Sequence, residues 1–320
     1  MSGTDERPSD DLDEFGQIAR LYRPLTRGAP EALDLLDDAA VIPSRPGFDL
    51  VVTKDAMVEG VHFLAGEAPD MIARKLLRVN LSDLAAKGAK PYGYFLAVAW
   101  PKSCDWSARQ RFADGLTQDG QIFDLTLLGG DTVSTSGPLT LSLTMLGWVP
   151  SGRMIRRGGG RPGDLVMVSG AIGDGFLGLA AARGEIPDAD GYLAGRYRLP
   201  TPRLDLEAAL SVGANAAADV SDGLIADAGH VARASRCGLR LDLDRLPLSP
   251  AGRGWLAGQA DRTAALVSLA SGGDDYEIVC AAPAPLEGFT VVGALTVEDE
   301  RDVRVDGARI EAGPGGWRHG

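Results

Sequence analysis

The sequence has few of the residues that usually build redox, disulfide or transition-metal centres. It contains three histidines and three cysteines, and it has no CxxC pair and no HExxH motif. An odd number of widely spaced cysteines does not fit a disulfide framework, and so few histidines do not fit a zinc enzyme. We expect reduced cysteines and a cytoplasmic protein.

Long apolar runs are also missing. No stretch approaches the roughly eighteen apolar residues of a membrane span, and the polar, acidic residues 1–12 do not have the pattern of a signal peptide. The net charge is −12, with 44 acidic and 32 basic residues. Such a surface repels nucleic acid and anionic lipid, so we expect neither a nucleic acid nor a membrane as a partner.

The usual nucleotide-binding loops are absent or incomplete. No Gly-Lys-Ser/Thr and no His-Arg-Asp sequence occurs, which excludes a Walker-type phosphate loop and a protein-kinase fold. GDGFLG, at residues 173–178, matches GxGxxG, but no acidic residue follows at the tip of a second strand about twenty positions later. A dinucleotide site remains the alternative, and the motif favours a tight, closely packed strand–helix turn.

Alternation of strand and helix patterns indicates two α/β domains. The chain has 320 residues, of which 45% are hydrophobic, enough for two cores. Residues 150–164, rich in glycine and arginine, are the best linker candidate. We predict a disordered tail at 1–12, an N-terminal domain at 13–150 and a C-terminal domain at 151–320.

Hydrophobic periodicity locates the main elements. Helices are predicted at 15–22 and 70–87, around 105–118, after residue 170 to about residue 183, and around 203–212, and residues 218–235 are predicted to be a turn leading into a helix. Strands are predicted at 49–55, 93–100, 124–128, 139–146 and 164–170, the first of them buried, and residues 265–282 read as helix or strand, then loop, then strand. Leu139, Leu141, Leu143 and Met145 alternate with hydroxyl residues, which indicates one buried and one polar face.

Carboxylates recur beside apolar segments along the chain, some of them at the ends of predicted strands and one, Asp83, inside a predicted helix. Each alone could be a helix cap or a turn residue, and Asp222 is a plausible N-cap. Asp83 fits that interpretation worst, because aspartate is a poor residue inside a helix. The set is Asp37, Asp38, Asp55, Asp83, Asp131, Asp219, Asp222, Asp274 and Asp275.

Taken together, these carboxylates favour Mg²⁺ chemistry. Oxygen ligands without histidine or cysteine suit a hard cation. Two such charges about 4 Å apart repel by about 4 kcal/mol at an effective dielectric constant near 20, so a cluster of them would require cations.

Seven motifs in order then give a resemblance to a known family. They are LDDAAVI, VTKDAMVEGVHF, NLSDLAAKGAKP, LLGGDT, RRGGGRPGDLVMVSGAIGD, DVSDGLIADAGH and SGGDDYEI, across residues 36–278. The series resembles the thiamine-monophosphate kinase family of the aminoimidazole ribonucleotide synthetase-like superfamily. It implies an α/β fold of two domains. The N-terminal domain would bind ATP and Mg²⁺ and pair its strands across a homodimer, and a C-terminal α/β domain would follow.

The resemblance also implies an activity and its residues. The activity would be ATP-dependent phosphorylation of thiamine monophosphate to thiamine diphosphate, by direct in-line transfer, in a transferase of thiamine diphosphate biosynthesis. Asp55, Asp83 and Asp131 would be central to the transfer. Magnesium positions would be Asp38, Thr53, Lys54, Asp55, Asp83, Asp131, Asp219 and Asp222. ATP would contact Gly130, Asp131, Arg157 and Ser221, and thiamine monophosphate would contact His62, Asp274 and Trp317.

Three positions depart from the family pattern. Leu36 replaces a glycine, and Asp274 replaces a glutamate and is one methylene shorter. Lys54 stands where a hydroxyl residue is common. A protonated lysine cannot ligate Mg²⁺, although its ammonium group could lie against a phosphate.

Other functions remain open at this point. A related superfamily enzyme could phosphorylate another acceptor, although selenophosphate synthetase is disfavoured because no early cysteine lies in a glycine-rich loop. A non-catalytic module could bind Mg-ATP without turning it over. A calcium-binding protein is the weakest alternative, because no DxDxDG loop occurs.

Overall fold

The computed structural model describes residues 14–297, 303–305 and 308–310. The predicted tail at 1–12 and the predicted substrate residue Trp317 lie outside these ranges. The described chain forms two compact α/β units. The first contains residues up to 46, 52–80 and 91–147, and the second contains 47–51, 81–90 and the remainder from 148 onward. Strand β1 and helix α2 therefore contribute residues to both units.

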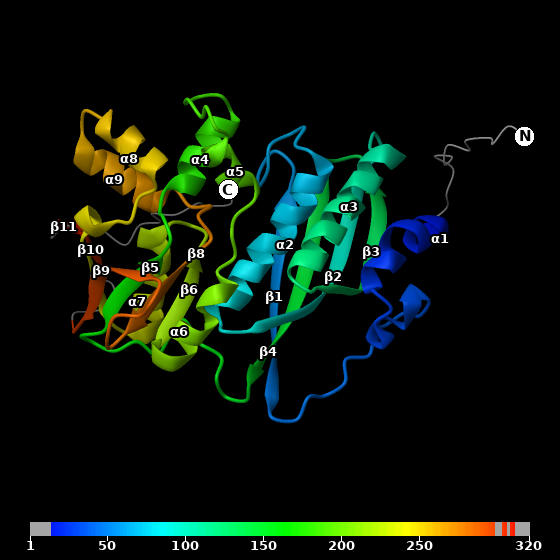
Figure 1. The fold of residues 1–320 in the computed structure, drawn as a ribbon, viewed down its shortest axis with the longest axis horizontal. Helices are drawn as coiled ribbons and strands as arrows, with labels where there is room; N and C mark the ends of the chain where they lie inside the picture. Colours follow the sequence, from blue (N-terminus) through cyan, green and yellow to red (C-terminus); the bar gives the residue numbers. More distant parts are fainter. Residues whose placement is uncertain (1–13, 298–302, 306–307, 311–320) are drawn as a thin grey trace, which may run out of the picture. The chain divides into compact units, whose positions relative to one another are not determined.

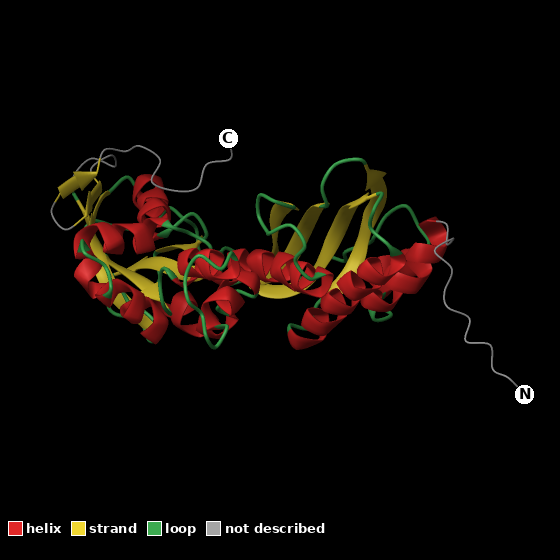
Figure 2. Cartoon of the chain, turned by 90° about the horizontal axis from the view of Figure 1, so that it is seen from above, coloured by secondary structure: helices red, strands yellow, loops and turns green. Residues whose placement is uncertain are grey.

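A four-stranded sheet, in the order β1-β4-β2-β3, forms the centre of the first unit. In Figures 1 and 2, the helices α2 and α3 lie along one face of this sheet. The elements are α1 (Glu14–Gln17), the helical turns Ile18–Tyr22, Arg23–Thr26 and Pro30–Leu35, β1 (Phe48–Val58), α2 (Pro69–Ala86), β2 (Lys90–Pro101), α3 (Trp106–Ile122), β3 (Thr126–Thr135) and β4 (Thr140–Pro150).

The two long helices form where their sequences predict. In α2, Ile72, Leu76 and Val79 are buried on one face, and Gly88, at a φ of 64°, follows the helix end. Helix α3 begins at Asp105, whose carboxylate accepts the Ala108 N–H at 2.8 Å.

Strand β1 forms as predicted, but the prediction that it is buried is wrong. Phe48, Leu50 and Val52 are 37%, 38% and 56% exposed. These alternate residues share one face of an edge strand, because side chains in a strand repeat with period two. The apolar run resembled a buried strand because sequence alone does not show which face of an edge strand is covered.

The second unit is built on a seven-stranded sheet in the order β11-β10-β7-β9-β5-β8-β6. Its strands are β5 (Leu165–Ser169), β6 (Ala216–Val220), β7 (Gly238–Leu241), β8 (Glu277–Ala282), β9 (Phe289–Thr296), β10 (Val303–Val305) and β11 (Ala308–Ile310). Its helices and short turns are α4 (Asp174–Ala182), α5 (Tyr192–Arg198), Leu204–Leu206, α6 (Glu207–Gly213), α7 (Leu224–Ser235), Leu243–Arg245, α8 (Pro250–Ala257) and α9 (Arg262–Ser271).

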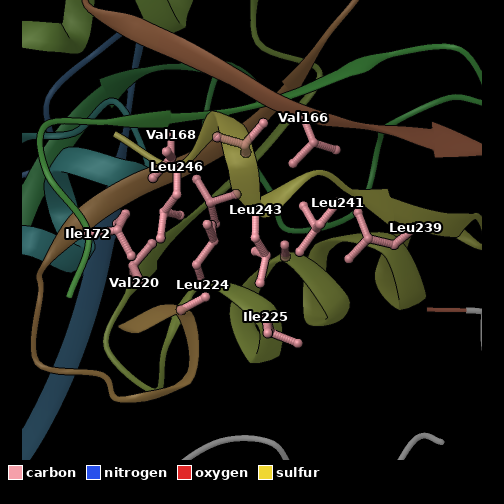
Figure 3. Packing of buried hydrophobic residues seen from close by; sticks show 14 of the residues in the cluster. Val166, Val168, Ile172, Val220, Leu224, Ile225, Leu239, Leu241, Leu243 and Leu246 are labelled. Carbon is pink, nitrogen blue, oxygen red and sulfur yellow. The ribbon is translucent and has the colours of Figure 1, made fainter. Parts of the chain in front are cut away.

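The central strands of this sheet are buried on both faces. In β5, Val166 and Val168 belong to one hydrophobic cluster and Met167 belongs to another. Figure 3 shows the first cluster, in which Leu224 and Ile225 of α7 lie with these valines. Burial on both faces explains why the strand sequences are continuously apolar rather than alternating.

Three turns of the second unit lie at the same end of its sheet. Strand β8 lies between β5 and β6 and is antiparallel to both. The turns that follow β5 and β6 therefore flank the loop at 272–276, which precedes β8. The order and direction of these strands therefore bring the SDG and GGDDYE motifs to the same end of the sheet.

The predicted linker segment packs on the second unit. The carbonyl of Arg156 accepts the Ala217 N–H at 2.9 Å, and the Gly160 N–H donates to the Ser235 hydroxyl at 3.0 Å. A β-carbon at Gly158 would lie 2.6 Å from the Ala234 carbonyl oxygen. The glycines of this segment therefore permit close approach to the second unit. No helix among the described residues is long and apolar enough to cross a membrane.

Candidate functional site

The GGDT motif lies inside a strand, whereas the sequence predicted it just after one. Strand β3 continues to Thr135, and its pairing with β2 shifts register at Tyr94 and Phe95. A β-carbon at Gly130 would overlap the Leu96 carbonyl, so the close approach of β2 requires glycine there. Sequence reasoning ended the strand too early because glycine usually marks a turn.

A pocket of about 530 Å³ in the first unit brings two predicted carboxylate motifs together. Gly130 and Asp131 line it from β3, and Asp37 and Asp38 line it from the segment after the Pro30–Leu35 turn. Its remaining walls are largely apolar, formed by Phe15, Ile18, Tyr22, Ala32, Leu35, Leu36, Ala39, Ala40, Phe95, Leu96, Leu127 and Leu128, together with Gly129 and Thr132. The pocket therefore has apolar walls and an acidic section beside exposed glycine backbone.

The predicted site residues of β1 do not line this pocket. Lys54 donates from Nζ to the Ser142 hydroxyl at 2.7 Å, and that hydroxyl lies 3.4 Å from the Asp55 carbonyl. Thr53 and Asp55 are half-buried on the same strand. The Lys54 ammonium group therefore contacts the hydroxyl of Ser142 in β4.

His62 lies in the turn that follows β1. Its Nδ1 accepts the Val58 N–H at 3.0 Å, and its carbonyl accepts a hydrogen bond from Lys75 Nζ at 3.2 Å. The hydrogen bond from the Val58 N–H fixes the orientation of the imidazole ring. Because Nδ1 accepts this bond, the proton of the neutral ring lies on Nε2.

In the second unit, Asp222 is not the N-cap of α7. Gly223 occupies the cap position, and the Asp227 carboxylate accepts the N–H groups of Ser221 and Asp222, both at 3.0 Å. The prediction of a capping role for Asp222 is therefore wrong. A carboxylate from the first turn of α7 supplies the acceptor, which leaves the Asp222 side chain for another role.

The adjacent loop brings a predicted substrate residue beside a predicted ATP residue. The Asp274 N–H donates to the Ser221 carbonyl at 2.9 Å, and the Tyr276 N–H donates to the Val220 carbonyl at 2.8 Å. Arg157 is exposed on the same unit, near enough to Asp227 and His230 to lower the pKa of each. The structure therefore joins Ser221, Asp274 and the surroundings of Asp222 in one region.

Asp83 and Asp219 share a basic neighbour. Lys87 donates from Nζ to the Ala217 carbonyl at 2.8 Å. Burial lowers the pKa of Lys87, and the charges of Asp219 and Asp83 act in the opposite direction. Asp219, which is 5% exposed, therefore has a cationic side chain nearby that offsets part of the electrostatic cost of burying it.

Burial also shifts the titration of two groups here. It raises the pKa of Asp227 to about 7, and the charge of Asp222 adds to that effect. It lowers the pKa of His230, and the nearby Arg233 lowers that pKa further. Both groups are thus biased toward their neutral forms.

Sequence reasoning missed Lys87 and Asp227. A signal existed for both: Lys87 follows Asp83 by one helical turn, and Asp227 lies one turn into the helix that follows the SDG motif. Within the described ranges, no three His, Cys, Asp or Glu side chains lie close enough together to hold a metal ion by themselves.

Comparison with known proteins first defines the class. The chain matches the family "AIR synthase related protein, N-terminal domain" over residues 36–149. It matches "AIR synthase related protein, C-terminal domain" over residues 161–301. The two α/β units and these matches define an aminoimidazole ribonucleotide synthetase-like protein, as the motifs predicted.

Individual relatives narrow the class. The chain is 66% identical to a thiamine-monophosphate kinase of Caulobacter vibrioides over 268 residues, which is 84% of this chain and 76% of that protein. It is 38% identical to the Escherichia coli thiamine-monophosphate kinase over 304 residues, or 90% and 91% of the two chains. The chain belongs to the thiamine-monophosphate kinase family.

Solved structures agree with this assignment. The thiamine-monophosphate kinase from Stenotrophomonas maltophilia K279a has a TM-score of 0.80 at 36% identity, covering 93% of this chain and 98% of that one. A structure of AaThiL complexed with AMPPCP and TMP has a TM-score of 0.78 at 29% identity, covering 98% and 99%. The family and fold predicted from the motifs are thus confirmed.

Proposed function

We propose that this protein transfers the γ-phosphoryl group of ATP to thiamine monophosphate, giving ADP and thiamine diphosphate. One observation carries the proposal: in a chain of this family, Asp37 and Asp38 line one pocket with Gly130 and Asp131. Carboxylates beside open glycine backbone are suited to nucleotide phosphates that arrive with a divalent cation. A related structure with AMPPCP and TMP supports the choice of ligands.

The donor set fits Mg²⁺. Magnesium usually keeps several waters and takes only one or two carboxylates together with substrate phosphates, so it does not need a closed protein cage. The pocket offers such a set in Asp38 and Asp131. When bound, the ion would neutralise charge on the phosphates and on the transferred group. We propose magnesium ligands at Asp38, Thr53, Asp55, Asp83, Asp131, Asp219 and Asp222.

The reaction requires positioning more than acid–base chemistry. A phosphate oxygen of thiamine monophosphate attacks the γ-phosphorus, and the bond from that phosphorus to the bridging oxygen of ADP breaks. The attacking oxygen is already ionised at neutral pH, so no general base is needed. The protein must hold two polyanions in line, and Gly130 would place unhindered backbone against the nucleotide phosphates.

The remaining assignments extend the same proposal. Arg157 and Ser221 would contact ATP, and His62, Asp274 and Trp317 would contact thiamine monophosphate. Residues 13–150 would bind ATP and magnesium, and residues 151–320 would form the C-terminal domain. We propose a cytoplasmic location, where the three unpaired cysteines would stay reduced.

We also propose that the enzyme is a homodimer. The exposed edge strand β1 carries Phe48, Leu50 and Val52 on one face. A second copy of the chain would remove this apolar surface from water and would pair the strand edge.

A turnover assay tests the function. Purified protein is incubated with ATP, Mg²⁺ and thiamine monophosphate, and ADP and thiamine diphosphate are quantified together. We expect equal amounts of the two products and little ADP without thiamine monophosphate. Binding of ATP without either product would favour a non-catalytic Mg-ATP module, and ADP formed only with a different acceptor would favour a related enzyme.

The Asp131→Asn variant tests the acidic section of the pocket. We expect kcat to fall at least ~100-fold, the scale of losing one key electrostatic group, because the amide cannot neutralise a cation. Asp124→Asn is the matched control: Asp124 precedes β3, its side chain is 87% exposed, and its contact is a surface ion pair with Arg27. Near-normal turnover by Asp131→Asn in a folded protein would contradict the assignment.

A further inference from the structure

The GxGxxG motif of this chain already holds a carboxyl group, which comes from one of the chain's own side chains. The Asp275 carboxylate accepts the Gly173 N–H at Oδ2 and the Gly175 N–H at Oδ1, both at 2.8 Å. Asp275 is 1% exposed. The N–H groups of the glycine turn at the start of α4, a type of turn that elsewhere binds a phosphate, are therefore taken up by an internal carboxyl group.

Asp275 follows Asp274 directly, and the loop around both has an unusual backbone. Gly273, Asp274 and Tyr276 have φ values of 73°, 59° and 52°. Two residues with side chains in the left-handed region, separated by one position, are unfavourable unless the surroundings impose them. The geometry of this loop is therefore set by its contacts rather than by local preference.

Contacts on both sides impose that geometry. On the β5 side, Asp275 is bound by the glycine turn. On the β6 side, the N–H groups of Asp274 and Tyr276 donate to the carbonyls of Ser221 and Val220. The loop is thus fixed to both neighbouring turns at the same end of the sheet.

Close packing adds a second constraint on the β5 side. A β-carbon at Gly175 would overlap the Asp274 carbonyl, and a β-carbon at Gly173 would lie 2.7 Å from the Leu269 side chain. The glycines of the motif are needed because the loop backbone and α9 lie directly against them.

We infer that Asp275, seated in the glycine turn at 173–175, is the positioning residue of the acceptor site, and that it sets where the Asp274 carboxylate meets thiamine monophosphate. This inference rests on the proposed function. Asp274 is one methylene shorter than the glutamate common in the family, so a small shift of its backbone would remove its reach to the acceptor. ATP contacts outside this loop would be affected less.

The Asp275→Asn variant tests the inference. The amide offers one acceptor oxygen in place of two, so one glycine N–H loses its partner. We expect the KM for thiamine monophosphate to rise at least ~10-fold and the KM for ATP to change less than about twofold. Asp164→Asn is the matched control: Asp164 is 4% exposed and accepts hydrogen bonds from Arg161 and Asn215, away from this loop. We expect the control to leave the ratio of the two KM values unchanged.

Gly175→Ala gives an independent test if Asp275→Asn does not fold. Its methyl group would displace the Asp274 backbone, and it should give the same selective rise in KM. Gly195→Ala, in α5, is its control, because a β-carbon there meets no atom within 4 Å. The inference is overturned if the folded Asp275→Asn and Gly175→Ala proteins keep both KM values, or raise both equally.

Hydrogen exchange separates this inference from the proposed function. In wild-type protein without ligands, we expect the Gly173 and Gly175 amides to be protected, and Asp275→Asn to reduce that protection at least ~10-fold while Asp164→Asn does not. A wild-type protein without kinase activity would refute the proposed function, and the exchange result would still decide whether Asp275 anchors the loop. Unchanged protection in Asp275→Asn would refute the anchor even in an active enzyme.

Discussion

At the scale of the residue, burial separates the carboxylates into two groups with different roles. Asp131 and Asp38 are exposed in the pocket, where they can meet a cation and phosphates. Asp227 and Asp275 are 1% exposed and accept backbone N–H groups of the site loops. Identical side chains thus hold backbone where they are buried, and where they are exposed in the pocket they stay open to the ligands proposed above.

The buried group gives a pH dependence. Burial raises the pKa of Asp275 from its ordinary 3.8 to about 8, although the N–H groups of Gly173 and Gly175 act in the opposite direction. Between these values the folded state binds a proton that the unfolded state has released. The contribution of Asp275 to the free energy of unfolding is therefore fully present below pH 4 and falls as pH rises to about 8.

Chemical denaturation at pH 5 and pH 8 checks this prediction. Asp275→Asn has no such titration, so its loss of stability relative to wild type should be larger at pH 5 than at pH 8. The difference should change by at most about 1.4 kcal/mol per pH unit. If the loss of stability in Asp275→Asn is the same at pH 5 and pH 8, or larger at pH 8, Asp275 is ionised in the native state throughout this range.

At the scale of the element, strand β3 shows how a backbone contact constrains the wall of a pocket. Gly130 lies in the pocket, and it also permits the close approach of β2 at Leu96. The same glycine therefore serves the pairing of the two strands and the opening of the pocket. Mutation of Gly130 must disturb the sheet as well as the site.

Gly130→Ala should destabilise the protein by at least about 2 kcal/mol, in the range of overpacked interior positions, because the new methyl group would overlap the backbone of β2. Thermal unfolding with and without ATP measures the effect. Gly137→Ala is the control, since its β-carbon would lie 3.4 Å from a single hydroxyl in the loop between β3 and β4. Equal stability of the two variants would mean that β2 yields at Leu96 at little cost.

At the scale of the whole molecule, an apolar face on β1 predicts self-association. The chain has a mass of 33.5 kDa. We expect sedimentation analysis to give a species of about twice that mass, because burying Phe48, Leu50 and Val52 is favoured by about 25 cal/mol for each Å² of apolar surface.

Val52→Glu tests this assembly. A charge on the exposed face of β1 should shift the protein to monomer, because burial of an unpaired carboxylate is costly. Val212→Glu, at a 90% exposed position of α6, should leave the mass unchanged. Wild-type protein that sediments as a monomer at all concentrations would remove the proposed dimer.

Sequence alone determined much of this protein. The periodicity of Ile72, Leu76 and Val79 located α2 and its buried face, because a helix repeats every 3.6 residues whatever surrounds it. The prediction that GDGFLG forms a tight, closely packed strand–helix turn was confirmed. The ordered motifs sufficed to place the chain in its family, because that spacing of carboxylates and glycines is specific.

Only the tertiary structure decided which strands are covered, where β3 ends and which groups the buried carboxylates contact. Whether β1 was covered, whether β3 ended before its glycines, and whether Asp222 capped α7 depended on neighbours distant in sequence. The partners of Asp275 lie about 100 residues away, across a β5–β8–β6 arrangement that no local pattern encodes. Burial and hydrogen-bond partners are properties of packing, so side chains of one type acquire their separate roles only when the sheet brings its turns together.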